Sequence, residues 1–319
     1  MVVPDLPFSA PDRTFISCLV QSPSLSHLSS SYSSVYSSAL FCSFVVIRNF
    51  FPRLVAAEHH LPYDRAPVSS GVAELDALLG GGPERGSSLL LMGPAGCGKS
   101  AIACRYSVAA AGRGERVAVF AFDEGVTMYL ARARSLGMDA EEHIEAGRLT
   151  VQQIDPAELS PGEFAHAVRA AVERDGARLV VIDSLNGYLN AMPSERHLTL
   201  HLHELLTYLG QQGVTTILLM AQHGLVGGNA QVPIDASYLA DTVILMRYFE
   251  VVGEVRQAIS VIKKRTGRHE RTIREVRFES GRGIVIGEPI REFQGVLTGT
   301  PAFVGSGPGG PRSGDGPPQ

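Results

Sequence analysis

The chain has 319 residues, a formal net charge of -4 and a charged fraction of 19%. Its apolar fraction of 45% excludes a wholly disordered chain. The mildly acidic balance argues against a general nucleic-acid binder, which is usually strongly basic. The four cysteines form no CxxC pair and have no zinc-type spacing, which excludes a disulfide scaffold and favours a reduced, cytoplasmic setting.

The two ends of the chain differ in composition from the part between them. Residues 1–48 are rich in serine and contain few charged residues. We expect this segment to be low-complexity and disordered, because it lacks the basic flank of an export signal and its apolar runs are far shorter than the about 20 residues of a membrane span. Residues 298–319 are rich in glycine and proline and are predicted to be a disordered tail. One full domain is expected over residues 63–297, preceded by a linker at 49–62.

Within this domain, apolar runs typical of strands alternate with helical patterns. Strands are predicted at 88–92, 117–122, 149–154, 179–182 and 214–220. Helices are predicted at 99–111, 126–136, 160–174 and 194–212, the third of them starting with a capping box. The chain then changes to strands alone, at 242–248, 255–264, 272–278 and 284–286. This order predicts an α/β fold with a mostly parallel sheet, helices on both of its faces and a C-terminal antiparallel β extension.

The most specific motif follows the first predicted strand and opens the first predicted helix. It fits the phosphate-loop pattern GxxxxGK[ST] and reads Gly93-Pro94-Ala95-Gly96-Cys97-Gly98-Lys99-Ser100. Glycines allow backbone N–H groups to surround phosphates, and the helix start adds a positive dipole end. Lys99 is predicted to reach the β- and γ-phosphates, Ser100 to bind Mg²⁺, and Ala101 to complete the loop's contacts with ATP. The alternative is a chance match in a glycine-rich turn.

Carboxylates follow two other predicted strands. Asp183 closes the apolar run at 179–182, where an acidic residue would hold Mg²⁺ through water. Asp123 and Glu124 follow the strand at 117–122, where a carboxylate would orient or deprotonate the attacking water. We assign this catalytic role mainly to Glu124, with Asp123 in support, because adjacent side chains point in different directions. The alternative for Asp183 is a helix cap, and the alternative for Asp123 and Glu124 is a surface or capping carboxylate.

Two weaker signals complete the set of candidates. Gln222 follows the strand at 214–220 and is either a sensor of the γ-phosphate or a plain polar strand end. Lys263 and Arg265 share one face of a predicted strand, because the side-chain period of a strand is two. They could reach a γ-phosphate bound to a neighbouring subunit, as arginine fingers do, or form a basic hairpin at a solvated edge. The residues alone do not separate these alternatives.

Together, the stretches SSGVAELDALLGGGPERGSSLLLMGPAGCGKS, FAFDEG, RLVVIDSLNGYLNAMPSERH, YLADTVILMRYFE and VIKKRTGRHERTIREVRF resemble the KaiC-type branch of the RecA-like P-loop ATPases. The resemblance covers about residues 67–297. It implies a RecA-like fold, a hexameric ring with ATP between subunits, and an acidic catalytic pair at Asp123 and Glu124. It also implies a lysine, an arginine and a histidine that act on the neighbouring subunit's ATP, here Lys263, Arg265 and His269.

The sequence departs from the KaiC type in three respects. The acidic pair is commonly Glu-Glu, and here the first member is Asp. Clock members phosphorylate themselves on a Ser-Thr pair, which here corresponds to Ser237 and Tyr238, so a serine is present but the threonine is missing. Clock proteins also carry two such domains, whereas this chain holds one. Residues 51–59 resemble the tail of a preceding copy, which suggests a shortened tandem protein.

The sequence therefore predicts an ATP- and Mg²⁺-dependent ATPase that acts as a signalling or timing module, with Ser237 as a candidate site of serine/threonine autokinase activity and a signalling protein as a candidate partner. One alternative is a RecA-type DNA recombination or repair ATPase. The stretches 186–193 and 223–239 argue against it, because they contain no Lys or Arg to bind DNA phosphates. A further alternative is a switch that binds ATP to assemble a ring without hydrolysing it. No membrane partner is expected.

Overall fold

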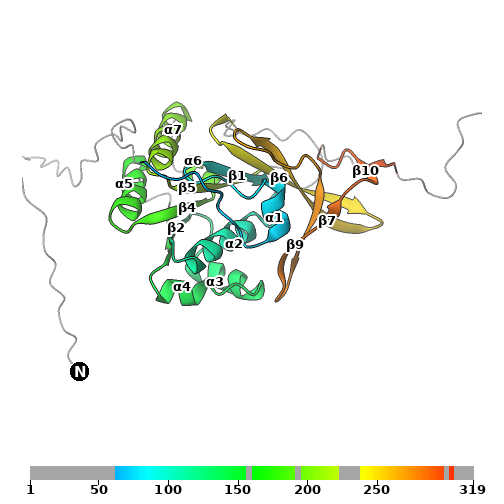
Figure 1. The fold of residues 1–319 in the computed structure, drawn as a ribbon, viewed down its shortest axis with the longest axis horizontal. Helices are drawn as coiled ribbons and strands as arrows, with labels where there is room; N and C mark the ends of the chain where they lie inside the picture. Colours follow the sequence, from blue (N-terminus) through cyan, green and yellow to red (C-terminus); the bar gives the residue numbers. More distant parts are fainter. Residues whose placement is uncertain (1–61, 156–159, 191–194, 223–237, 298–301, 305–319) are drawn as a thin grey trace, which may run out of the picture. The chain divides into compact units, whose positions relative to one another are not determined.

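The computed structural model describes residues 62–155, 160–190, 195–222, 238–297 and 302–304 (Figure 1), without the side chains of 190 and 195–198. The described residues belong to one compact unit, Asn49–Gln319. The predicted segment 1–48, nearly all of the linker and most of the tail lie outside them, as does the candidate phosphorylation site Ser237. None of the described helices is both long and apolar enough to cross a membrane.

The described part of the chain contains a nine-stranded sheet in the order β3-β2-β4-β5-β1-β6-β7-β8-β9. The strands with parallel neighbours are β1 (Ser88–Gly93), β2 (Arg116–Ala121), β3 (Leu149–Gln153), β4 (Ala177–Asp183), β5 (Thr215–Ala221) and β6 (Thr242–Val251). The antiparallel strands that follow are β7 (Glu254–Lys264), β8 (Arg274–Glu279) and β9 (Gly283–Pro289). A separate small sheet pairs β10 (Phe293–Gln294) with β11 (Ala302–Phe303). The predicted α/β class with an antiparallel extension is confirmed.

Strand β6 corrects one detail of the sequence prediction. Its residues were expected to belong to the antiparallel extension, but β6 pairs in parallel with β1, from Leu89 opposite Thr242 to Met92 opposite Leu245. On its other side it pairs antiparallel with β7. The apolar pattern of β6 could not distinguish these directions, because the direction depends on where the chain re-enters the sheet after β5. β6 therefore joins the parallel sheet to its extension.

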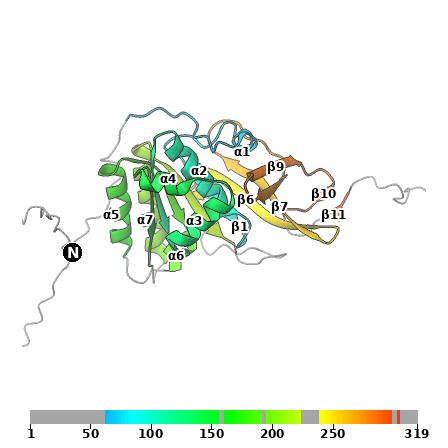
Figure 2. The same cartoon turned by 90° about the horizontal axis from the view of Figure 1, so that it is seen from below.

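Helices cover both faces of the sheet, as predicted, and Figure 1 shows α7 and α2–α4 on opposite sides of the strands. The helices are α1 (Ala73–Leu78), α2 (Lys99–Gly112), α3 (Val126–Ser135), α4 (Ala140–Glu145), α5 (Pro161–Glu173), α6 (Leu185–Asn190) and α7 (Glu195–Gln211). Successive side chains of a strand point to opposite faces. Accordingly, Leu89 and Leu91 of β1 pack in the core under α2 and α3, whereas Leu90 packs with α5 and α7. Figure 2 shows the same layers from below.

Local sequence signals account for two of the longer helices, α5 and α7. The predicted capping box of α5 is present: Glu163 donates its backbone N–H to Ser160 Oγ, and Ser160 donates its N–H to the Glu163 carboxylate. The leucine face of α7 is buried at Leu202, Leu205 and Leu209. The short helices α1, α4 and α6 were not predicted, because six residues contain too few apolar repeats to define a helical period.

Candidate functional site

The candidate site lies at the carboxyl edge of four neighbouring parallel strands. β2, β4, β5 and β1 are adjacent in the sheet. Parallel strands end at the same edge, so the segments that follow them come together there. The phosphate loop follows β1, and the predicted residues Glu124, Asp183 and Gln222 end or follow β2, β4 and β5. The topology thus gathers the sequence motifs at one place.

The backbone of the phosphate loop depends on its glycines. Gly96 and Gly98 have φ angles of 78° and 98°, which side-chain-bearing residues rarely adopt. A Cβ added to Gly98 would stand 1.9 Å from the Phe278 ring. Gly98 is also the N-cap of α2, and no side chain caps this helix start. The first N–H groups of α2 therefore lack a side-chain cap and are suited to phosphate oxygens.

Lys99 places its ammonium inside this loop. The residue is only 8% exposed, and Nζ donates hydrogen bonds to the carbonyl oxygens of Gly93 at 3.0 Å and Pro94 at 2.7 Å. The thiol of Cys97 lies 3.8 Å from Nζ. Burial raises the pKa of this thiol, although the charge of Lys99 acts in the opposite direction. The loop therefore holds one buried positive charge next to a neutral thiol.

Ser100 and Asp183, the two predicted Mg²⁺ ligands, lie close enough for the Ser100 hydroxyl to act on the Asp183 carboxylate. Burial raises the pKa of Asp183, and the charges of Glu124 and Asp123 add to this rise, while the interaction with Ser100 opposes it. The described residues contain no group of three or more His, Cys, Asp and Glu placed to hold a metal. Mg²⁺ needs few protein ligands when phosphates and waters complete its shell, so a hydroxyl beside a carboxylate fits this ion.

Asp123 and Glu124 point to different partners. Asp123 accepts a hydrogen bond from the hydroxyl of Ser184, which follows β4. Glu124 accepts two from the Arg132 guanidinium on α3, Nη1 to Oε2 and Nη2 to Oε1, each at 2.5 Å. Burial lowers the pKa of Arg132, but the hydrogen bonds and charge of Glu124 outweigh burial and raise it overall. The two carboxylates are thus oriented by separate elements.

Gln222 is tied directly to the phosphate loop. Its backbone N–H donates to the carbonyl oxygen of Gly93 at 3.0 Å, and that oxygen also accepts from Lys99. The side-chain oxygen Oε1 of Gln222 is buried and makes no hydrogen bond. A buried amide oxygen without a donor is costly, so this side chain is poised to respond to a new donor in the site.

The predicted basic group lies at the opposite edge of the sheet. Lys264 pairs with Thr242, and Thr242 pairs with Leu89 near the start of β1. Because Gly93 is four residues further along β1 than Leu89, the distance along the strand is about 13 Å. Arg265 follows Lys264 and lies still further from the loop. These cations therefore do not reach the phosphate loop of their own chain.

The side chains of this basic group follow the predicted alternation. Lys263 Nζ donates to Ala240 O at 2.8 Å, and Arg265 donates to the neighbouring carbonyl of Tyr238. Lys264 points elsewhere, donating to Gly82 O at 3.2 Å. His269 lies half-buried in the segment after β7. Within one chain, none of these residues contacts the carboxylates of Asp123, Glu124 or Asp183.

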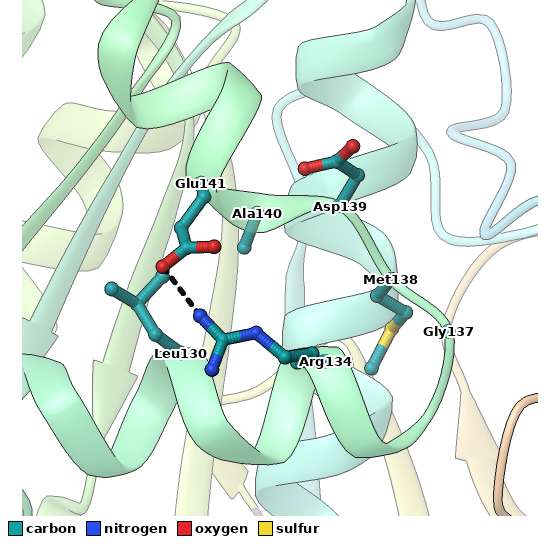
Figure 3. Close-up of a pocket in the computed structure, with 7 residues that line it drawn as sticks. All are labelled: Leu130, Arg134, Gly137, Met138, Asp139, Ala140 and Glu141. Carbon is teal, nitrogen blue, oxygen red and sulfur yellow. Dashed lines mark hydrogen bonds and ion pairs between the residues drawn. The ribbon is translucent and has the colours of Figure 1, made fainter.

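A surface hollow between α3 and α4 is separate from this site (Figure 3). It is lined by Leu130, Arg134, Gly137, Met138, Asp139, Ala140 and Glu141. Arg134 and Glu141 form an ion pair there at 2.6 Å and are largely exposed. The hollow contains no predicted site residue, so we place the candidate chemistry at the sheet edge.

The comparison with protein families decides the classification. A family model described as "ATPase: KaiC" matches residues 68–291. The chain belongs to the KaiC ATPase family. This membership confirms the resemblance found in the sequence, and with it a RecA-like ATPase fold.

Curated KaiC relatives match a similar length of the chain. The chain is 29% identical over 236 residues to "Circadian clock protein KaiC3" from Synechocystis sp., covering 74% of this chain and 46% of the relative. It is 29% identical over 237 residues to "Circadian clock oscillator protein KaiC" from Synechococcus elongatus, covering 74% and 45%. A protein of that same description from Thermostichus vulcanus is 28% identical, with the same coverage. The chain thus spans slightly under half the length of these KaiC relatives.

Three residues of this KaiC-family site were not singled out in the sequence. Ser184 orients Asp123, and Arg132 orients Glu124. Asn186 exchanges two hydrogen bonds with the backbone of Ala221, at 3.1 and 2.7 Å, and so fixes the residue before Gln222. Ser184 and Asn186 stand within three residues of Asp183, a proximity that could have marked them. No local pattern marks Arg132, because its role depends on how α3 packs.

Proposed function

We propose that this KaiC-family chain binds ATP with Mg²⁺ and hydrolyses it at the interface between two subunits. One observation carries this proposal. The phosphate loop with Lys99, the Ser100–Asp183 pair and Glu124 all lie at one edge of the sheet. A phosphate-binding loop alone would support binding. The carboxylate beside it supports hydrolysis, because it can accept a proton from the attacking water.

Each residue has a distinct task in this mechanism. The backbone N–H groups of residues 93–101, except Pro94, which has none, surround the phosphates, and Lys99 neutralises charge on the β- and γ-phosphates. Ser100 would bind Mg²⁺ directly and Asp183 would hold it through water; when bound, this ion neutralises phosphate charge. Glu124 orients and deprotonates the attacking water, with Asp123 in support. Gln222 responds to the γ-phosphate and transmits its presence to the segment that follows.

Charge balance supports catalysis between subunits. The site of one chain holds three carboxylates, Asp123, Glu124 and Asp183, against the cations of Lys99 and Arg132. A bound triphosphate adds further negative charge that Mg²⁺ neutralises only in part. Cations from another chain would complete the balance, and we assign this role to Lys263 and Arg265 at the opposite edge, with His269 in the segment that follows them. We therefore propose a closed ring, with six subunits as the KaiC resemblance implies.

The biological role rests on the relatives. Those described above carry names that refer to a circadian clock, and we propose a signalling or timing role for this chain. Autophosphorylation on Ser237 is a second candidate activity, favoured by the serine at the place where clock members have their Ser-Thr pair. The described cysteines, Cys97 and Cys104, are buried and free, which is compatible with a cytoplasmic location.

Incubation of the purified chain with γ-labelled ATP and Mg²⁺ separates these activities. Free labelled phosphate supports the ATPase, labelled protein supports the autokinase, and bound ATP without either supports an assembly switch. Ser237→Ala should abolish protein labelling and leave phosphate release intact. Addition of single-stranded DNA tests the recombinase alternative, which requires DNA to stimulate phosphate release. Size measurements with and without ATP test the ring.

A further inference from the structure

The ion pair between Arg132 and Glu124 has an unusually defined geometry. Each of the two guanidinium end nitrogens donates one hydrogen bond to a different carboxylate oxygen, at 2.5 Å. The side chains are only 21% and 16% exposed. A planar two-point contact fixes direction as well as distance, which a single bond from a flexible lysine would not do.

Arg132 is itself held in place by its own helix. Its guanidinium lies 5.4 Å from the centre of the Tyr129 ring, within the range of a cation–π contact. Tyr129 is 2% exposed and packs in the core beneath the sheet. Burial raises the pKa of the Tyr129 hydroxyl, so the ring stays neutral under the cation. The Arg132 side chain, which binds Glu124, therefore packs against a buried aromatic ring that holds it in place.

The position of this pair connects it to the chemistry. The charges of Arg132, Glu124 and Asp123 all act on Asp183, so the pair lies within electrostatic range of the predicted Mg²⁺ ligand. Glu124 follows β2 and precedes α3, and without Arg132 its side chain could adopt several rotamers. A carboxylate has about four lone-pair positions, and the contact with Arg132 uses two of them. Lone pairs therefore remain for a water molecule.

We infer that Arg132 is a positioning residue that aims the Glu124 carboxylate at the attacking water. This inference rests on the proposed role of Glu124 in ATP hydrolysis. Arg132 acts through Glu124 rather than on the nucleotide. Its loss should therefore lower kcat while leaving the KM for ATP and the affinity for ATP nearly unchanged. Misplacement of a reacting group by about 1 Å can cost on the order of 100-fold in rate.

The test compares five variants of the full chain with wild type, the fifth being the double variant of Arg132→Gln with Glu124→Gln. Arg132→Gln removes the two-point contact, Arg132→Lys restores one bond, and Glu124→Gln removes the base. Arg134→Gln is the matched control, because Arg134 lies on the same helix as Arg132 but pairs with Glu141 of α4, and these two side chains are 69% and 51% exposed. Phosphate release, ATP binding by calorimetry and thermal unfolding are measured for each variant.

The expected result is a fall in kcat of about 10- to 100-fold for Arg132→Gln, partial recovery in Arg132→Lys and no change in Arg134→Gln. Combined with Glu124→Gln, the Arg132→Gln change should lower kcat no further, because its effect passes through the carboxylate.

Three results would overturn the inference: an unchanged or increased kcat in Arg132→Gln, a loss of ATP binding that accounts for the whole defect, or additive effects in the double variant. The single Glu124→Gln variant tests the proposed function separately. If it hydrolyses ATP as wild type does, the catalytic role of Glu124 fails, whatever Arg132 does.

Discussion

Gln222 donates its backbone N–H to the carbonyl oxygen of Gly93, which joins the end of β5 to the first residue of the phosphate loop. The same oxygen accepts from the Lys99 ammonium. A change in how Lys99 is bound can therefore alter the hydrogen bonding of Gln222 without a large motion. This arrangement gives the proposed γ-phosphate sensor a physical connection to the loop.

Gln222→Ala tests this connection. The backbone bond to Gly93 remains in the variant, so the loop should keep its shape and ATP should bind with an affinity within about threefold of wild type. Phosphate release should fall by roughly tenfold or more, because the side-chain amide no longer responds to the γ-phosphate. Calorimetry and a phosphate-release assay measure the two effects. Wild-type hydrolysis in the variant would show that Gln222 is a plain strand end.

Gly98 should tolerate no side chain. Gly98→Ala combines a φ of 98° with a Cβ that would approach the Phe278 ring to 1.9 Å. We expect a loss of about 2 kcal/mol or more in unfolding free energy, together with loss of ATP binding. Gly147→Ala is the control, because φ is 66° but no atom lies within 4 Å of its Cβ. The control substitution should lower the free energy of unfolding by about 1 kcal/mol and leave ATP binding intact. Urea unfolding measures the first effect and calorimetry the second.

Catalysis between subunits predicts complementation. A variant with Lys263→Ala and Arg265→Ala keeps its own Glu124, and Glu124→Gln keeps both cations. Each should be nearly inactive alone, whereas mixed rings contain some interfaces with a complete site. Phosphate release from the mixture should therefore exceed that of either variant. Mixed assemblies, verified by differently tagged subunits, that remain inactive would contradict the trans arrangement.

Asp183 should make the ATP-free protein less stable as pH rises. Burial raises its pKa in the folded state, so the folded protein binds a proton more tightly than the unfolded chain. The stability linked to that proton is present below the ordinary Asp pKa and is lost as pH rises from that value through the raised one. The Asp183→Asn variant should lose less stability as pH rises, and at neutral pH it should be more stable than wild type when neither protein has ligand. Mg²⁺ and ATP should stabilise wild type but not the variant. Thermal melts across pH, with and without both ligands, measure this.

The sequence predicted the fold class and the motifs well because both depend on local patterns. Continuous apolar strands between helices specify a parallel sheet, and its carboxyl edge brings Lys99, Asp183 and Glu124 together regardless of side-chain detail. The direction of β6 was not predictable, since apolar strands of either direction look alike.

The hydrogen-bond partners of Asp123 and Glu124 could not be predicted from sequence patterns either. Ser184 reaches Asp123 from a neighbouring strand, and Arg132 reaches back to Glu124 from two turns along α3. Both contacts depend on tertiary packing rather than on spacing along the chain.

Phosphate release from wild type and Glu124→Gln, each saturated with ATP and Mg²⁺, is the most direct test of the account. We predict that both proteins bind ATP, and that wild type releases phosphate while Glu124→Gln is slower by about 100-fold or more. Equal release from the two proteins, or bound ATP that wild type never hydrolyses, would contradict the assignment of this sheet edge as an ATPase site.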